Sequence, residues 1–414
     1  MNRKKDGNSS LRAAGRRATA ENPPLPNFFE TQKDKSDHLS HTTSAGNRTC
    51  GICGGRHPAA VPMRLRGGIT SDERYIPGAS PGWLLCPQCG GVTACDGILD
   101  PETFYRDDYA FLLENTEIEP AIAESQKKYS EVLAEFFSPH IGKRQGTFLD
   151  IGAGKGNFLI AMHQAKPELE LHAVEPSQSF AKLRQISFLK TCRQAFFSAK
   201  DYTGTKWDYL SLIGVLEHVP APGDFLTEIR SIMADSTLLL IEVPNFRNNT
   251  GDWLVVDHLT KFTPENLEQL FLRRGFSIVD KRVTASVPMQ FIVKKGPVRP
   301  VDFSGCPPVD ISADEVIRFM KEVSDIKTDC VFFGGNSFSN YLVHAEPDFA
   351  RRVKAVVNDN HFYQGRNYLD TEIPVIGYDT FKTRYSGLPV ILALGRGYYD
   401  RVLPRLQGER VIRL

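Results

Sequence analysis

Four cysteines near the beginning of the chain have the spacing of a metal site. They form two Cys-x-x-Cys pairs, Cys50 with Cys53 and Cys86 with Cys89, and both pairs lie beside glycines that allow tight turns. Zinc binds four thiolates tetrahedrally, and a site whose four positions are all filled by protein is structural. We therefore expect these cysteines to bind one structural Zn²⁺.

A glycine-rich turn is the second place where the residue types suggest chemistry. After the apolar run that begins at residue 146, Asp150, Gly152, Gly154 and Gly156 form the pattern D-x-G-x-G-x-G. The dinucleotide fingerprint is G-x-G-x-x-G and a P-loop ends in G-K-[ST], so neither matches. Closely spaced glycines let the backbone approach a flat ligand that has no phosphate, and helix N–H groups remain for a carboxylate.

Two acidic residues further along the chain extend this candidate site. Glu175 ends the next apolar run, where an acidic side chain can accept hydrogen bonds from both hydroxyls of a ribose. Glu217 and His218 follow a third apolar run, WDYLSLIGV. From its position, His218 could pack beside a cofactor or could carry a proton.

The elements that would position these residues alternate between strand and helix patterns. This alternation predicts a parallel α/β sheet. The expected strands span residues 146–152, 169–175, 207–215 and 236–244, helices start near residues 156, 177, 222 and 264, and the runs 276–284 and 287–296 form a closing strand pair. Beyond a stretch rich in proline and glycine, the alternation restarts with a helix at 313–325 and strands at 329–335, 353–359 and 389–394.

The three motifs together resemble those of class I S-adenosylmethionine (SAM)-dependent methyltransferases. LDIGAGKGNF, VEPS and LIGVLEHV match the first, second and fourth strand motifs of that superfamily, over residues 145–295. The resemblance implies a Rossmann-like, seven-stranded domain that binds SAM. It places Asp150 and the loop glycines at the methionyl end, Glu175 at the ribose, and Glu217 and His218 beside the cofactor. A dinucleotide-binding Rossmann unit with unusual glycines is the alternative.

The wider order of motifs resembles the zinc-containing C-methyltransferases of nucleotide-linked deoxysugars. In that family, a histidine in a Y-x-E-H-x-x-Y-F segment removes a proton beside a keto group, and the resulting enolate accepts the methyl group. Here His258 falls on that histidine and Asp257 on the glutamate, which implies a base and its orienting partner. The resemblance also makes Tyr109 a substrate-pocket residue. Val255 replaces the family's tyrosine, and Phe338 replaces a lysine of its C-terminal unit.

These observations predict an α/β protein with five segments and a transferase activity. The segments are a disordered tail (1–48), a zinc-binding module (49–98), a SAM-dependent methyltransferase domain with a helical lead-in (99–295), a linker (296–310) and a smaller α/β domain for the substrate (311–414). The expected acceptor is a carbon of a nucleotide-linked keto deoxysugar or a related small molecule. The alternatives are an O- or N-methyltransferase of another biosynthetic intermediate, in which His258 belongs to a cofactor lid, and a non-catalytic SAM-binding scaffold.

Composition narrows the classes of partner. The formal net charge is +1, so the chain lacks the basic field typical of proteins that bind nucleic acid or membrane surfaces. No apolar run approaches the roughly 20 residues of a membrane helix, and the first residues lack the apolar core of a secretory signal. We therefore expect a cytoplasmic protein with a small-molecule substrate, and no nucleic-acid or membrane partner.

Overall fold

The computed structural model describes most of the chain after residue 48. The described residues are 49–55, 59–61, 63, 65–80, 82–94, 101–109, 120–142, 145–284, 288–300 and 313–413. The predicted disordered tail and most of the predicted linker lie outside them. Within these residues, every helix is too short or too polar to cross a lipid bilayer.

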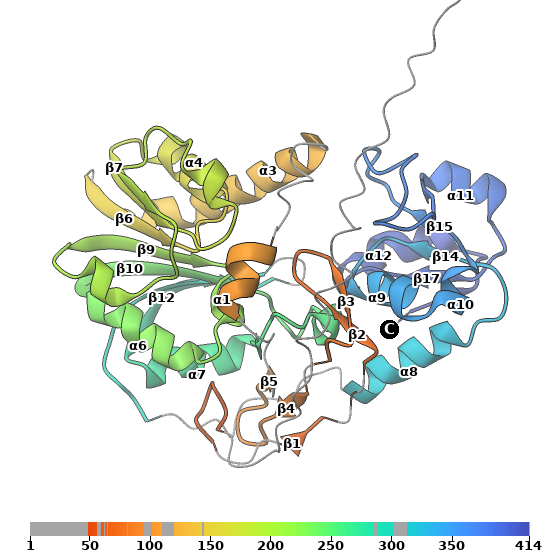
Figure 1. Cartoon of the computed structure of the whole chain (residues 1–414), viewed down its shortest axis with the longest axis horizontal. Coiled ribbons are helices and arrows are strands. Elements are labelled where there is room, and N and C mark those ends of the chain that lie inside the picture. Colours follow the sequence, from red (N-terminus) through yellow and green to blue (C-terminus); the bar gives the residue numbers. More distant parts are fainter. Residues whose placement is uncertain are drawn as a thin grey trace, which may run out of the picture. The chain divides into compact units, whose positions relative to one another are not determined.

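The largest sheet has seven strands in the order β12-β13-β10-β9-β6-β7-β8. Figure 1 labels β6, β7, β9, β10 and β12 of this sheet. The bounds are β6 Gly146–Ile151, β7 Leu169–Val174, β8 Thr191–Arg193, β9 Trp207–Ile213, β10 Met233–Val243, β12 Phe276–Arg282 and β13 Met289–Lys295. Strands β8, β7, β6, β9 and β10 run parallel, whereas β13 is antiparallel to both β10 and β12. The predicted strands and the closing strand pair are therefore confirmed.

Helices cover both faces of this sheet, and that explains why its strands are apolar on both sides. The helices are α3 Pro120–Phe137, α4 Asn157–Ala165, α5 Phe180–Leu183, α6 Pro222–Ile232 and α7 Pro264–Arg273. Side chains of successive strand residues point to opposite faces. Phe148 accordingly packs in the core cluster that contains residues of α3 and α4, and Leu149 packs in the cluster with residues of α6 and α7.

A second sheet has five strands in the order β16-β15-β14-β17-β18, all parallel. Its elements are α8 Ala313–Ser324, β14 Cys330–Phe333, α9 Ser337–Ala345, α10 Pro347–Ala350, β15 Val353–Val357, β16 Val375–Ile376, α11 Tyr378–Arg384, β17 Val390–Leu392, α12 Tyr399–Val402 and β18 Val411–Ile412. The restart of the α/β alternation is confirmed. Strands β16 and β18 were not predicted, because two residues are too few for a strand pattern. The strand order reverses at β14, a place where α/β sheets commonly bind ligands.

The cysteine-rich segment forms a small sheet with a strand from much later in the chain. Strands β1 Ala59–Ala60, β4 Trp83–Leu85 and β5 Val92–Ala94 are joined by β11 Thr260–Lys261, in the order β1-β4-β5-β11. A separate hairpin pairs β2 Gly67–Ile69 with β3 Tyr75–Pro77. The antiparallel pairing of β11 with β5 places the residues just before β11, His258 included, next to the cysteine-rich segment.

Candidate active site

The predicted glycine turn connects β6 to α4 and needs its glycines for two different reasons. Gly152, Gly154 and Gly156 all have positive φ values, of 75°, 54° and 83°, a conformation that other residues rarely adopt. A Cβ atom would lie 2.5 Å from Val215 at Gly152 and 2.4 Å from Ile186 at Gly156, but would meet nothing within 4 Å at Gly154. The outer two glycines therefore allow close packing, and Gly154 leaves open space above the turn.

Glu175, directly after β7, is hydrogen-bonded to this turn. Its Oε2 accepts a hydrogen bond from the Gly154 N–H (2.7 Å), and its Oε1 accepts one from the Ser177 N–H (2.8 Å). An ionised carboxylate has about four lone-pair positions, so further donors can still bind Glu175. The carboxylate can thus hold the turn in place and accept hydroxyl groups of a ligand.

Asp150, the last acidic residue of β6, is held deeper in the sheet. Its Oδ1 accepts a hydrogen bond from Ser211 Oγ at 2.6 Å. Burial raises the pKa of Asp150 to about 7, although the bond from Ser211 opposes the shift. A cationic ligand at this position would favour the ionised form.

A cavity of about 1430 Å³ brings most of the predicted site residues together. The predicted residues that line it are Asp150, Gly152, Gly154, Glu175, Glu217, His218, Tyr109 and His258. Gly156 and Asp257 are not among its lining residues. Asn336, Asn340 and Tyr368 line it from the five-stranded part of the chain.

His258 forms a buried charge cluster with Asp252 and Lys261. The His258 Nδ1 lies 2.5 Å from Asp252 Oδ1, and the Lys261 ammonium lies 3.4 Å from Asp252 Oδ2. Burial by itself would lower the pKa of His258, but the negative charge and hydrogen bond of Asp252 outweigh it and raise that pKa above its usual 6.5. Asp252 keeps a lowered pKa despite its burial, because His258 and Lys261 both stabilise its charge.

Asp257, which the sequence predicts as the partner of His258, contacts another residue. Its Oδ1 accepts from the Ser71 N–H (2.8 Å) and its Oδ2 from Ser71 Oγ (2.6 Å). The carboxylate bound to the His258 ring is that of Asp252, because the single 3₁₀ turn Thr250–Leu254 folds the chain back toward the histidine. Asp257 instead fixes the loop after β2.

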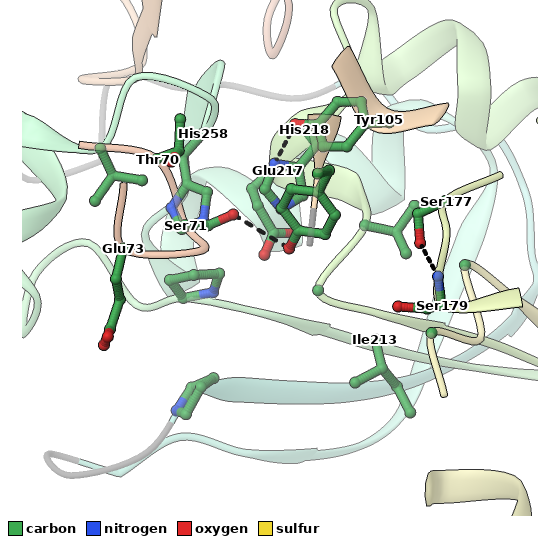
Figure 2. A pocket seen from close by; sticks show the side chains of 18 of the residues that line it. Thr70, Ser71, Glu73, Tyr105, Ser177, Ser179, Ile213, Glu217, His218 and His258 are labelled. Carbon is green, nitrogen blue, oxygen red and sulfur yellow. Dashed lines mark hydrogen bonds between the residues drawn. The ribbon is translucent and has the colours of Figure 1, made fainter. Parts of the chain in front are cut away.

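His218 stays in the neutral form. It lies in the 3₁₀ turn Leu216–His218, and its Nδ1 is 2.9 Å from the Asp257 carbonyl oxygen. The same nitrogen is 2.7 Å from the hydroxyl of Tyr105, which Figure 2 shows beside it. Burial lowers the pKa of His218 to about 4, and the neighbouring charge of His258 contributes in the same direction. Tyr109 packs beside this pair, with its ring centre 5.2 Å from that of Tyr105 and its hydroxyl 3.3 Å from Ser71 Oγ.

Glu217 is buried beside both histidines, with 3% of its surface exposed. Its Oε2 has no hydrogen-bond partner among the residues that the structure describes. Burial raises the pKa of Glu217 to about 7, and the charge of His258 opposes that shift. Figure 2 shows Glu217 and the rings of His218 and His258 within one pocket.

The four predicted cysteines converge in one buried cluster, and none of them lines this cavity. Their sulfurs all lie within 4.8 Å of one another, with Cys50 Sγ 3.6 Å from Cys89 Sγ and Cys53 Sγ 3.5 Å from Cys86 Sγ. Four sulfurs about 2.3 Å from a tetrahedral zinc would lie roughly 3.8 Å apart, so the cluster fits that ion.

The two turns that carry these cysteines have the same hydrogen bonds. In the first, the Gly54 N–H donates to the Cys50 carbonyl, and in the second the Gly90 N–H donates to the Cys86 carbonyl. Gly55 and Gly91 N–H groups donate to the Cys53 and Cys89 sulfurs. Such donors stabilise thiolate ligands, which also supports the fit to a metal.

Sequence reasoning missed three residues of the site. Asp252 stands six positions before His258, Lys261 three positions after it, and Tyr105 lies in the π-helical turn Phe104–Asp108. Charged residues are common at such spacings on protein surfaces, so nothing in the sequence indicated that Asp252 and Lys261 are buried together.

The comparisons with known proteins agree with the fold. Residues 122–281 match a family model described as a methyltransferase domain. No curated protein sequence matches the chain. Solved structures that are similar include CalO1, a methyltransferase in calicheamicin biosynthesis with bound SAH (18% identity, 45% of this chain and 60% of that one, TM-score 0.34).

A second similar structure is the plantazolicin methyltransferase BpumL with SAH (12% identity, 48% of this chain and 94% of that one, TM-score 0.38). A third is the riboflavin-derivative dimethyltransferase RosA from Streptomyces davawensis (22% identity, 39% of this chain and 55% of that one, TM-score 0.32). The chain thus spans 60% of the length of CalO1 and 55% of that of RosA. The TM-scores of these structures are too low to indicate the acceptor. The family match shows a methyltransferase domain over residues 122–281, and the order of the seven strands agrees with a class I SAM-dependent domain.

Removal of the Asp252 charge tests the buried cluster. We expect Asp252→Asn to lower the free energy of unfolding by about 3–5 kcal/mol, because Lys261 and His258 would remain buried without their counter-charge. Chemical denaturation followed by circular dichroism measures the change. The double variant Asp252→Asn/Lys261→Met should recover part of the loss, and strictly additive effects would contradict the pairing.

Proposed function

We propose that the chain transfers the methyl group of SAM to a carbon beside a keto group in a small-molecule acceptor, with His258 as the base. The observation that supports this most directly is the buried His258–Asp252 pair. It lines the same cavity as Gly154 and Glu175, which are the residues proposed to hold the donor.

The turn after β6 is the proposed binding site of the methyl donor. SAM supplies a methyl group attached to a positively charged sulfur. Asp150 and the open space above Gly154 are proposed to receive its methionyl end, and the free lone pairs of Glu175 its ribose. Donor and acceptor held in line can account for several orders of magnitude in rate.

The orientation of the His258 ring supports its proposed role as the base. Its Nδ1 is bound to Asp252, so Nε2 is the nitrogen that can accept a proton. The acceptor C–H bond breaks as the proton moves to Nε2, the released electron pair forms the new bond to the methyl carbon, and the donor sulfur leaves as a neutral thioether. Asp252 stabilises the imidazolium that forms, and a positioned base contributes about 10²–10⁴ in rate.

The acceptor that the family resemblance favours is a nucleotide-linked keto deoxysugar or a related activated compound. Asn336, Asn340 and Tyr368 can supply neutral hydrogen bonds to such a molecule. Phe338, at the position of the family's lysine, is buried against Phe319 and offers no charge.

An O- or N-methyl transfer is the second candidate. It is favoured by Val255, which lines the cavity where the family has a tyrosine and so supplies no hydroxyl near the acceptor. Transfer to such an atom needs no strong base, and His258 would then be a structural residue of the loop.

We also propose that Cys50, Cys53, Cys86 and Cys89 bind a structural Zn²⁺. Cys86 directly follows β4 and Cys89 shortly precedes β5, so the ion would fix these two strands, and β5 pairs with β11. In this way the metal would support the position of His258 without contact with the substrates.

Substitution of His258 tests the base. His258→Gln should lower kcat by about 10²–10⁴ and leave SAM affinity unchanged, because the side chain keeps a polar group but loses its proton acceptor. Turnover of labelled SAM with candidate keto sugars, with and without a nucleotide, and calorimetry of SAM binding give the two values. The control His140→Gln lies outside the cavity and should behave as wild type. An unchanged kcat would eliminate the base, and a wild type that binds SAM but consumes no acceptor would favour the scaffold.

The pH dependence follows from the raised pKa of His258. The base must be neutral, so kcat/KM should rise with pH through the folded-state pKa, with a midpoint above 6.5. Stability has the opposite sign: the protonated pair adds stability below pH 6.5, and this contribution is lost as pH rises through the folded-state pKa. Rates and denaturation midpoints between pH 5.5 and 9.5, at roughly constant ionic strength, test both. The rising limb should be absent from the residual activity of His258→Gln.

Metal analysis tests the cysteine cluster. The purified protein should contain about one equivalent of zinc, and Cys86→Ser should lose most of it because three ligands do not close the site. Cys192→Ser, which changes a cysteine outside the cluster, is the matched control and should keep its zinc. A wild type without zinc after purification in the absence of chelators would refute the proposal.

A further inference from the structure

We propose that Glu217, His218 and His258 form a second metal site, which binds a divalent transition-metal ion inside the cavity. Each of the three residues offers one ligand atom, and these atoms all lie within 4.8 Å of one another. The four cysteines are separate from this group, so the chain would hold two different metal sites.

The hydrogen bonds of the two histidines involve the same nitrogen, Nδ1, of each ring. His258 Nδ1 is bound to the Asp252 carboxylate. His218 Nδ1 lies 2.9 Å from the Asp257 carbonyl oxygen and 2.7 Å from the Tyr105 hydroxyl, and an N–H at Nδ1 that donates to the carbonyl makes Nε2 the acceptor nitrogen. Metal-binding histidines almost always donate their other ring N–H to a carboxylate or a backbone carbonyl, because this fixes the ring and the tautomer. Both rings are therefore oriented as ligands with Nε2 available.

Glu217 gives a second, separate reason to expect a bound cation between these residues. The residue is 3% exposed, and within the described part of the chain its Oε2 has no hydrogen-bond partner. A buried carboxylate oxygen without a partner is costly, and native proteins rarely leave one. A cation between Glu217 and the two imidazoles would satisfy that oxygen.

The ligand set selects the kind of ion. Two imidazole nitrogens and one carboxylate suit Zn²⁺, Co²⁺, Ni²⁺ or Fe²⁺, whereas Mg²⁺ and Ca²⁺ prefer oxygen ligands. Three protein ligands leave coordination positions open, and the cavity lies next to them. An oxygen atom of the acceptor could occupy such a position.

The consequence for activity rests on the proposed function. A metal ion on His258 Nε2 occupies the nitrogen that the proposed base uses, so the ion and the transferred proton exclude each other. Occupancy of the second site is therefore expected to inhibit methyl transfer.

The experiment measures binding directly, in full-length protein whose cysteine cluster is already loaded with zinc. Co²⁺ is titrated and its visible absorption recorded, while thiolate charge-transfer absorption reports any exchange at the cysteines. We expect one further equivalent with nitrogen and oxygen ligands. Glu217→Gln, which keeps the size of the side chain, should weaken Co²⁺ binding by at least about 10–100-fold.

Glu242→Gln is the matched control, because Glu242 is a second buried carboxylate at the same cavity, bound instead to Tyr129 and Gln290. It should bind Co²⁺ as wild type does. His218→Gln is a second test variant, and retained zinc in the cysteine cluster together with SAM binding shows that each variant is folded.

The outcomes separate the two proposals. No further equivalent of Co²⁺, or equal affinity in Glu217→Gln and wild type, overturns the metal site and leaves the base to its own test. A bound ion that lowers turnover supports both proposals. A bound ion that raises turnover supports the metal site and overturns the role of His258 as base.

Discussion

The buried contacts of the Asp252 carboxylate with His258 and Lys261 are the constraint on which the site depends. All three side chains are buried, so none of them can be left alone without a large desolvation cost. The Lys261 ammonium also donates to the Val255 carbonyl oxygen (2.8 Å) and lies 4.4 Å from the Trp83 ring centre. The cluster thereby determines the path of the loop between residues 252 and 261.

The cysteine-rich segment contacts this loop through hydrogen bonds and a strand pairing. The Trp83 indole N–H donates to the Trp253 carbonyl (3.1 Å), the Val256 N–H donates to the Ile69 carbonyl (2.8 Å), and β11 pairs with β5. Each contact joins residues far apart in the chain. The small sheet thus supports the loop that carries His258, while the separate hairpin contributes Ile69, Thr70 and Ser71 to the wall of the cavity.

The two histidines of the cavity differ because their neighbours differ. His218 faces a tyrosine hydroxyl and a backbone carbonyl, and burial lowers its pKa to about 4. His258 faces an ionised carboxylate, which raises its pKa above 6.5. Groups whose environments move their pKa values in opposite directions are typical of acid–base sites. The surroundings of His218 therefore favour its neutral form, whereas those of His258 favour its protonated form.

The sequence by itself determined the elements whose signal is local. Apolar runs and their spacing predicted the strands β6, β7, β9 and β10. Closely spaced glycines predicted the turn before α4, and the structure gives them positive φ values, because local backbone geometry depends on neighbouring residues. The sequence likewise predicted that the four cysteines lie together, because two Cys-x-x-Cys motifs within one segment are typical of a metal site.

Only the tertiary structure decided which side chains meet. It placed Asp252 rather than Asp257 on His258, brought β11 into the cysteine-rich sheet, and left the Glu217 oxygen without a partner beside two imidazoles. Such contacts depend on how separate loops pack, and the energy of a buried charge depends on partners that adjacent residues do not reveal.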